Sequence, residues 1–271
     1  MPVFDKKSIL DKILEHKRQE VAAAQRELPL NELKSRLRDL PQSRGKSRFA
    51  RALTKTDKVS LIAEIKKASP SAGLIREDFD PRALGAAYAE GGASALSVLT
   101  DRKYFQGADE YLVQAKAASG LPALRKDFTV SAYQLYDSCL LGADCVLLIA
   151  AALEEGRLAE FIALADELSL DALVEVHNQA ELELAVACKA RIIGVNNRDL
   201  KTFEVLLKVS ENLAELLPSS CVKVSESGIS SHGHIRLLGS LGYDAVLVGG
   251  HLMRAADPAA AVRTLMNGNS L

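Results

Sequence analysis

Cysteine is scarce in this chain, and the spacing of its cysteines offers no metal clip. The four cysteines, Cys139, Cys145, Cys188 and Cys221, form no Cys-x-x-Cys pair and lie in apolar contexts. A free thiol in such a context behaves as a small hydrophobic side chain. His232-Gly233-His234 resembles a metal clip, but no further ligand follows at a suitable spacing. We expect buried, inert thiols and no metal, with a disulfide or a metal role as the alternative.

Long apolar runs and an excess of charge of one sign are also absent. No apolar run reaches the roughly 20 residues that a membrane helix needs, and candidates such as Cys145–Leu153 have the length of a buried strand. The N-terminus lacks the apolar core of a signal peptide. The formal net charge of −1 leaves no basic surplus for nucleic acid and no acidic block typical of disorder. We expect a cytoplasmic protein that binds neither membranes nor nucleic acid.

Short apolar runs that alternate with helical patterns fill the chain from residue 59 onward. Each run is continuously apolar, as is typical of parallel strands covered by helices. The predicted strands are Val59–Ile65, Ala95–Leu99, Ala123–Lys126, Cys145–Ile149, Ala172–Val176, Ile192–Asn196, Val222–Ser225 and Ala245–Val248. The predicted helices are Pro81–Glu90, Ala108–Ser119, Val130–Leu141, Arg157–Glu167, Gln179–Ala187, Phe203–Leu217, Gly233–Ser240 and Pro258–Leu265.

Eight strand–helix pairs favour a closed (β/α)8 TIM barrel, an α/β fold that typically takes about 250 residues. The 271 residues therefore fit a single domain over residues 1–271. A doubly wound open sheet is the alternative, but the first turn, Ala68–Gly73, is not a dinucleotide-binding fingerprint.

The first 45 residues are predicted to form a charged helical extension ahead of the barrel. Ser8 is placed to cap a helix whose apolar stripe includes Ile9, Ile13 and Val21. The segment Gln42–Lys46 is polar and contains a glycine, so we expect a loop there.

Charged and amide side chains occupy the carboxyl ends of the predicted strands, where barrels of this kind hold their catalytic groups. Glu64 and Lys66 are two residues apart, so they share the inward face if Ile65 packs against the helices. The other strand ends supply Lys126, Glu175, Asn196 and Glu226. Because unpaired charges are costly in an apolar interior, we expect a functional site here, with a structural salt-bridge network as the alternative.

Glycine-containing turns follow the last two predicted strands. Ser227-Gly228 follows the seventh strand, and Gly249-Gly250 follows the eighth. Glycine lets the backbone approach a ligand, and free N–H groups at a helix start favour an anion. Phosphate sites recur after these two strands in this fold, so we expect one here, with simple tight turns as the alternative.

Eight segments, in order along nearly the whole chain, match a known family. They are Ala63–Ser71, Leu96–Thr100, Tyr104–Gly107, Leu124–Phe128, Ala143–Ile149, Leu173–His177, Gly194–Leu200 and Ser225–Ile229. With these motifs the chain resembles the indole-3-glycerol-phosphate synthase family. It departs from the family at two places. Ala72 stands where many members have a lysine. In Gly249-Gly250-His251 the second glycine stands after the first, where the family usually has a Ser, Glu or Ala. His251 either adds a donor or faces solvent.

The resemblance implies a lyase of tryptophan biosynthesis that uses no cofactor and no metal. Its phosphorylated small-molecule substrate is 1-(2-carboxyphenylamino)-1-deoxyribulose 5-phosphate. The ring carbon that bears the carboxylate attacks the sugar ketone, then carbon dioxide and water leave, and indole-3-glycerol phosphate forms. The resemblance also implies that residues 1–45 lie over the barrel mouth. We expect a monomer, with weak oligomerisation as the alternative.

Roles for the strand-end residues also follow from the resemblance. It implies that Lys126 is the general acid at the ketone and that Glu175 is the general base in the dehydration. For His177, which follows two residues after Glu175, we expect a local hydrogen-bonding role, with proton transfer as the alternative. Glu64 and Asn196 would position the sugar hydroxyls or the amine. The other implied residues are Lys66 and Arg198 for the carboxylate, Glu226 and Ser227 for the polar floor, Ser69, Gly228, Gly249 and Gly250 for the phosphate, and Phe105, Phe128, Leu147 and Leu200 for the aromatic ring.

Elementary chemistry supports these roles independently. A ketone that becomes an alkoxide needs a proton or a cation beside it, and a lysine ammonium offers both. Two alternatives remain. A phosphosugar isomerase or a Schiff-base aldolase could use the same scaffold, with Lys126 forming the Schiff base. A non-catalytic barrel could bind phosphosugars, although such a barrel should have lost the charged rim residues that this chain retains.

Overall fold

Eight parallel strands close into a barrel in this computed structural model, which describes residues 8–39, 45–55, 58–199 and 202–268. Around the barrel the order is β1-β10-β9-β8-β7-β6-β5-β4. The strands are β1 (Ser60–Ile65), β4 (Ala95–Leu99), β5 (Ala123–Lys126), β6 (Cys145–Ile149), β7 (Asp171–Val176), β8 (Ile192–Asn196), β9 (Val222–Glu226) and β10 (Ala245–Val248). The predicted (β/α)8 fold is confirmed, and every predicted strand is correct to within one residue at each end.

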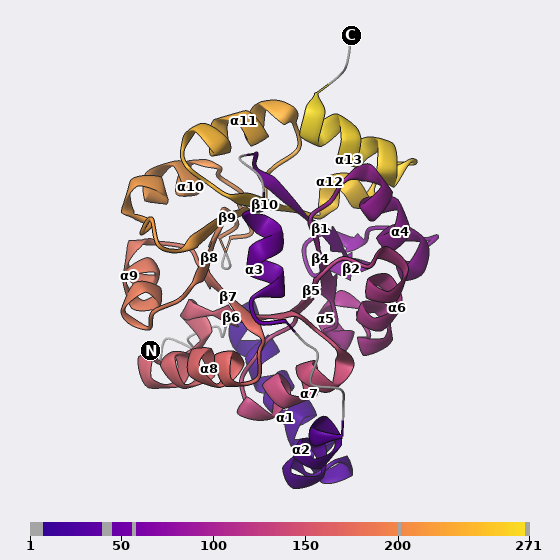
Figure 1. Cartoon of the computed structure of the whole chain (residues 1–271), viewed down its shortest axis with the longest axis vertical. Coiled ribbons are helices and arrows are strands. Elements are labelled where there is room, and N and C mark those ends of the chain that lie inside the picture. Colours follow the sequence, from indigo (N-terminus) through magenta and orange to yellow (C-terminus); the bar gives the residue numbers. More distant parts are fainter. Residues whose placement is uncertain (1–7, 40–44, 56–57, 200–201, 269–271) are drawn as a thin grey trace, which may run out of the picture.

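One ring of helices surrounds the barrel (Figure 1). Its members are α4 (Pro81–Gly91), α6 (Asp109–Ser119), α7 (Ala132–Leu141), α8 (Glu155–Glu167), α9 (Gln179–Ala187), α10 (Lys208–Leu213), α11 (His232–Ser240) and α13 (Pro258–Asn267). Local chemistry marks their ends. For example, the Asp80 side chain accepts hydrogen bonds from the first turn of α4, Pro81 occupies its first position, and Gly92 ends it with a φ of 99°.

Strand residues alternate between the barrel interior and the helix layer. Leu61, Ala63 and Ile65 of β1 pack with helix residues such as Tyr88, whereas Ile62 packs inside the barrel. The condition for Glu64 to point inward is therefore met, because neighbouring strand residues face opposite sides. The same alternation delivers one polar side chain from most strands to the carboxyl end of the barrel.

The predicted helix over Phe203–Leu217 is wrong in its first part. Helix α10 begins only at Lys208, and a 3-10 turn at Ala214–Leu216 follows it. Val205 instead forms an antiparallel bridge with Arg198, and the N–H of Leu206 donates to the carbonyl of Asn197 over 2.9 Å. Pairing with the loop after β8 therefore takes the backbone groups that a helix would need.

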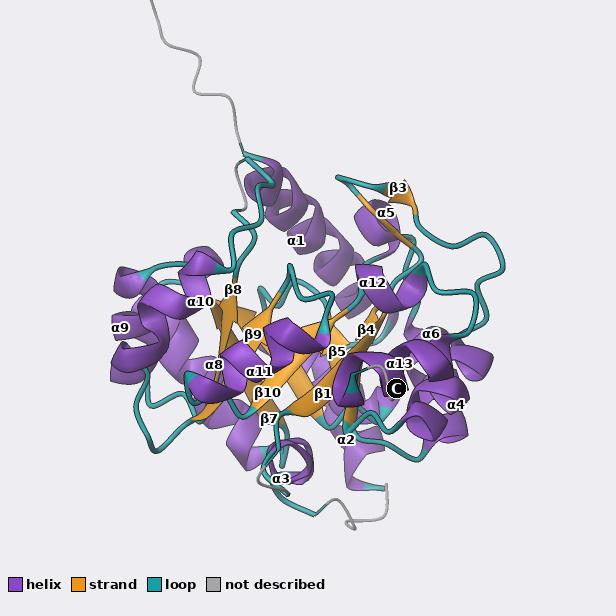
Figure 2. Cartoon of the chain, turned by 90° about the horizontal axis from the view of Figure 1, so that it is seen from above, coloured by secondary structure: helices purple, strands orange, loops and turns teal. Residues whose placement is uncertain are grey.

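Among the described residues three helices precede the first strand, and the first and third of them lie at opposite ends of the barrel (Figure 2). Helix α1 (Ile9–Glu27) lies beyond the carboxyl ends of the strands, and α2 (Leu30–Arg38) follows it. Ser8 and Asp11 form a capping box at the start of α1, so the predicted cap is confirmed. Lys46 lies in a turn, as expected, whereas residues 42–44 of the predicted loop lie outside the described residues.

The short helix α3 (Arg48–Leu53), which the sequence pattern did not predict, closes the other end of the barrel. Its Phe49 and Leu53 join the cluster of side chains that fills the barrel interior. Asp171, at the start of β7, accepts hydrogen bonds from the N–H groups of Phe49 and Ala50 over 3.0 and 3.1 Å. A carboxylate is favourable at a helix N-terminus, so Asp171 fixes this plug to the barrel.

Two further features agree with the composition. All four cysteines are free and buried, as predicted. Within the described ranges, no helix combines the length and the apolar character needed to cross a membrane.

Removing the Phe49 side chain of α3 should destabilise the whole barrel. Phe49 is fully buried, so Phe49→Ala leaves a cavity and should lower the free energy of unfolding by about 3–5 kcal/mol. Denaturant unfolding followed by circular dichroism measures this change. The control is Val113→Ala on α6, where the side chain is 47% exposed and the effect should stay within about 0.5 kcal/mol. Equal midpoints for the two variants would show that α3 does not support the barrel.

Candidate active site

A cavity of about 500 Å³ opens at the carboxyl end of the barrel. Fifteen of the residues expected at the site line it together: Glu64, Lys66, Ser69, Phe105, Lys126, Phe128, Leu147, Glu175, Asn196, Arg198, Glu226, Ser227, Gly228, Gly249 and Gly250. Leu200, the remaining one, lies outside the described residues. The structure therefore brings residues from all eight barrel strands and their loops into one space.

Lys126 is the centre of charge in the cavity. Its Nζ lies 2.9 Å from Oε2 of Glu175 and 2.6 Å from Oε2 of Glu226, which come from β7 and β9. Burial alone would lower the pKa of Lys126, but the charges of the two carboxylates outweigh burial and raise it well above its ordinary value. The side chain is therefore an ammonium at neutral pH and can act as a proton donor.

Glu226 differs from Glu175 although both contact the same ammonium. Burial and the nearby charge of Glu175 outweigh the effect of Lys126 and raise the pKa of Glu226 to about 7. Its Oε1 has no hydrogen-bond partner among the described residues. A Cβ at Gly194, on β8, would overlap this oxygen, so glycine is needed there for Glu226 to occupy its position.

Glu64 and Lys66 form a second ion pair beside the first. The Nζ of Lys66 contacts Oε1 of Glu64, and Lys66 is the more exposed of the two. A Cβ at Gly249 would overlap the Glu64 carboxylate, so this glycine has a steric role besides its proposed contact with phosphate. The Lys66 side chain is 20% exposed and that of Lys126 is 12% exposed, so the second cation is the more accessible to solvent.

A row of alternating acidic and basic groups runs from the cavity toward α9. Oε1 of Glu175 lies 3.4 Å from Nε2 of His177, and Nδ1 of His177 lies 2.9 Å from Oε2 of Glu181. The local hydrogen bonding predicted for His177 is confirmed. Burial by itself lowers the pKa of His177, but its two carboxylate neighbours outweigh burial and raise the pKa to about 10. Burial raises the pKa of Glu175, yet Lys126 and His177 together bring it well below its ordinary value.

The loop after β8 holds Arg198 at the cavity wall. The backbone N–H of Arg198 donates to Oδ1 of Asn196 over 3.0 Å, and its Nη1 donates to the carbonyl of Phe203 over 3.1 Å. One edge of the guanidinium is therefore anchored to its own loop. This anchoring leaves a preorganised cation beside Asn196.

Backbone geometry at the ends of β9 and β10 favours an anion. Ser227 and Gly228 have successive positive φ angles of 69° and 79°, which turns the chain sharply after β9. After β10, the chain forms the short helix α12 (Gly250–Met253). Such turns expose N–H groups toward a ligand. His251 is exposed and also lines the cavity, so it both meets solvent and can face a ligand.

Apolar side chains line the other part of the cavity. The rings of Phe105 and Phe128 have centroids 6.0 Å apart, and Leu147 lies in the same lining. Sequence reasoning missed Ile9, Leu10 and Ile13 of α1, together with Phe203 and Val205, among the lining residues. The apolar stripe of α1 was a usable signal, but its periodicity does not reveal which surface it covers.

Comparisons with known proteins point to one family. The family model described as indole-3-glycerol phosphate synthase matches residues 10–265. The indole-3-glycerol phosphate synthase of Paracidovorax citrulli is 46% identical over 261 residues, which cover 95% of this chain and 98% of the relative. The protein of the same name from Chromobacterium violaceum is 47% identical over 257 residues, covering 95% and 97%.

More distant solved structures share the fold alone. A 3-hexulose-6-phosphate synthase is 15% identical with a TM-score of 0.60, covering 78% of this chain and all of that one. A thiamine phosphate pyrophosphorylase from Pyrococcus furiosus is 17% identical with a TM-score of 0.57, covering 77% and 94%. The extent of the family match and the identity to these two relatives place the chain in the indole-3-glycerol phosphate synthase family.

Proposed function

We propose that this chain closes an indole ring on 1-(2-carboxyphenylamino)-1-deoxyribulose 5-phosphate, releasing carbon dioxide and water, as a lyase of tryptophan biosynthesis. The observation that carries the proposal is a buried lysine ammonium held between two carboxylates in a cavity with an apolar wall and an anion-binding end. The family membership supplies the identity of the substrate. The geometry supports a role for each part of that substrate.

Lys126 is the proposed general acid. During ring closure the sugar ketone oxygen gains negative charge, and a proton delivered by the ammonium neutralises it. Glu175 and Glu226 keep the ammonium protonated until the substrate arrives. After it regains a proton from solvent, the same lysine donates again to the resulting hydroxyl, which leaves as water. A Schiff-base aldolase would need the neutral amine as a nucleophile, which the two flanking carboxylates disfavour.

Glu175 is the proposed base for the dehydration. It is buried, ionised and within reach of the same reaction centre as Lys126. Glu64 and Asn196 line the same cavity and are suited to hydrogen-bond the sugar hydroxyls or the amine. Glu226, whose pKa is raised above its ordinary value, is the third polar side chain of this group.

Opposite charges match the two ends of the substrate. A phosphate and a carboxylate together carry about three negative charges at neutral pH. The proposed carboxylate ligands are Lys66 and Arg198, and the proposed phosphate ligands are the backbone around Gly228 and Gly250 and the side chain of Ser69; all of them line the cavity. Fixing both ends folds the flexible sugar so that the two reacting carbons meet.

The N-terminal helix α1 is proposed to cover the mouth of the barrel. Ile9, Leu10 and Ile13 line the cavity, which supports this arrangement. We propose that α1 shields the aromatic ring and the developing charges from water. Excluding water strengthens the electrostatic contribution of Lys126.

Product fluorescence tests the activity directly. Adding the deoxyribulose substrate should produce the emission of indole-3-glycerol phosphate, and the protein background is low because the chain contains no tryptophan. Heat-denatured protein is the control. Folded protein that consumes no substrate and yields no indole emission would contradict the proposed function.

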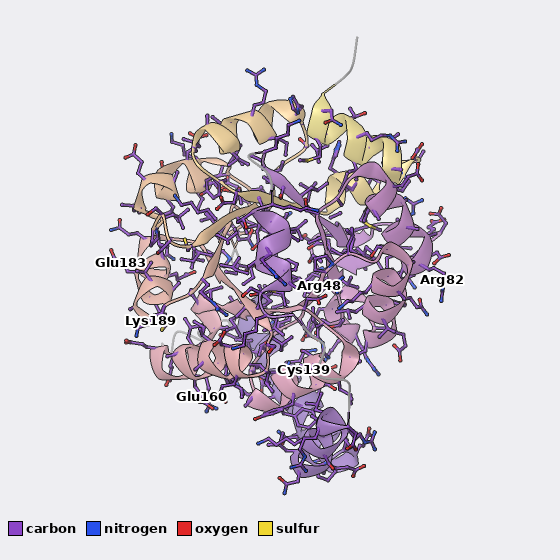
Figure 3. The ribbon with its side chains drawn as sticks, viewed as in Figure 1. Arg48, Arg82, Cys139, Glu160, Glu183 and Lys189 are labelled. Carbon is purple, nitrogen blue, oxygen red and sulfur yellow. The ribbon has the colours of Figure 1, made fainter. Side chains whose placement is uncertain are left out.

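Replacing the acid should separate binding from chemistry. Lys126→Ala should reduce turnover by at least about 100-fold, because a positioned general acid contributes about 10²–10⁴. The substrate should still bind through its two anionic ends, as isothermal calorimetry can measure. The control is Arg82→Ala on α4, which projects from the outer helix layer in Figure 3 and should keep full activity. A near-normal rate for Lys126→Ala would refute its assignment as the acid.

The charge of His177 should set the acid limb of the pH profile. His177→Gln removes a cation that faces Glu175, so the pKa of Glu175 should rise. A base that must be ionised then loses its function at a higher pH, and the acid limb of kcat/KM should move upward by about one unit. Glu183→Gln, on the outer side of α9 in Figure 3, is the matched control and should leave the limb in place. An unshifted limb in His177→Gln would mean that Glu175 is not the titrating base.

A further inference from the structure

Helix α1 contains a buried lysine that does not line the cavity. Lys17 is only 5% exposed and follows Ile13 by one helical turn, on the buried side of α1. Its Nζ contacts three carboxylates: Glu20 at 2.7 Å, Asp101 at 2.9 Å and Asp127 at 2.9 Å. Glu20 belongs to the same helix, whereas Asp101 and Asp127 follow β4 and β5. Lys17 therefore ties α1 to two strand ends of the barrel.

Asp101 supports the segment that carries Phe105. Its Oδ1 accepts the N–H of Tyr104 over 2.8 Å and so caps the short helix α5 (Arg102–Phe105). Tyr104 returns to α1, because its hydroxyl donates to the carbonyl of Lys12 over 3.3 Å. One wall of the aromatic pocket is thus attached to α1 through both Lys17 and Tyr104.

Asp127 supports the opposing ring in the same way. Its Oδ1 accepts the backbone N–H of Phe128 over 2.7 Å, and its Oδ2 accepts a hydrogen bond from Oγ1 of Thr100 over 2.7 Å. Asp127 also directly follows the proposed acid, Lys126. The two phenylalanines that face each other in the cavity are therefore each held by a carboxylate that Lys17 contacts.

The charge of Lys17 is needed to keep these two carboxylates buried together. Asp101 is fully buried and Asp127 is 7% exposed. Arg125 approaches Asp127 only to 4.0 Å, since it is engaged by Asp109 and Asp137 at 2.8 and 2.6 Å. Two buried carboxylates without adequate compensation repel each other, take up protons or turn toward water. Any of these changes would displace the loops that carry the phenylalanines.

We propose that Lys17 is a positioning residue that assembles the aromatic half of the active site by clamping α1 to the strand ends next to Phe105 and Phe128. This inference rests on the proposed function. The phosphate half is independent of the clamp, because the described contacts of Lys17 do not include the loops after β9 and β10, which carry Gly228 and Gly250. Loss of the clamp should therefore weaken recognition of the ring but not of the phosphate.

Two small probes separate these halves. Anthranilate represents the ring with its carboxylate, and inorganic phosphate represents the other end. In Lys17→Met, calorimetry should show the affinity for anthranilate falling by about tenfold or more, with the affinity for phosphate unchanged within about twofold, because a misplaced positioning group loses only the contacts that it orders. The KM for the substrate should rise in parallel, and kcat should fall less. Arg18→Met, an exposed neighbour on the same helix, is the control and should match the wild type.

A second variant keeps the test decisive if Lys17→Met does not fold. Asp101→Asn preserves the cap on Tyr104 but removes the charge that meets Lys17, so it should also weaken anthranilate binding alone. Equal losses for both probes, unchanged anthranilate affinity, or a wild type without saturable anthranilate binding would each overturn the inference. If the wild type binds both probes and the variant loses affinity for anthranilate alone, but the wild type forms no indole, the proposed function is refuted instead. If the wild type turns over the substrate but the variant loses affinity equally for both probes, only the role of Lys17 is refuted.

Discussion

The ammonium of Lys126 between Glu175 and Glu226 is the interaction on which the site depends. Each of these groups would be unfavourable alone in the interior of a barrel, because burial penalises its charged form. Together they offset most of that penalty. Unequal surroundings then separate the two acids, so that one carboxylate stays ionised while the other binds a proton near neutral pH. An acid and a base can therefore coexist a few ångströms apart.

The barrel makes this arrangement possible through a simple geometric rule. Alternate residues on each strand face inward, and all strands point the same way, so the last inward position of each strand reaches the same end. Apolar residues fill the layers below it, and Phe49 of α3 closes the opposite end. The charged layer therefore lies on a rigid apolar base, which fixes the distances among its members.

The sequence predicted the strand layout and most of the site, because both depend on short-range patterns. Apolar runs locate the eight barrel strands, and the shared face of Glu64 and Lys66 follows from two-residue spacing. Features that depend on long-range packing were missed. Helix α3 has only six residues and no strong pattern, and its position depends on Asp171, more than a hundred residues away. The sequence analysis did not single out Lys17, because nothing in the local sequence points to Asp101 or Asp127.

The two glycines opposite the carboxylates have a consequence for redesigning this barrel. Gly194 and Gly249 contribute no side chain, and the space that they leave is occupied by Glu226 and Glu64. A methyl group at either position would overlap the neighbouring carboxylate, and at Gly194 it would also overlap Leu173 of the apolar interior. Libraries that vary the barrel interior should therefore hold these two positions constant, although neither glycine carries a functional group of its own.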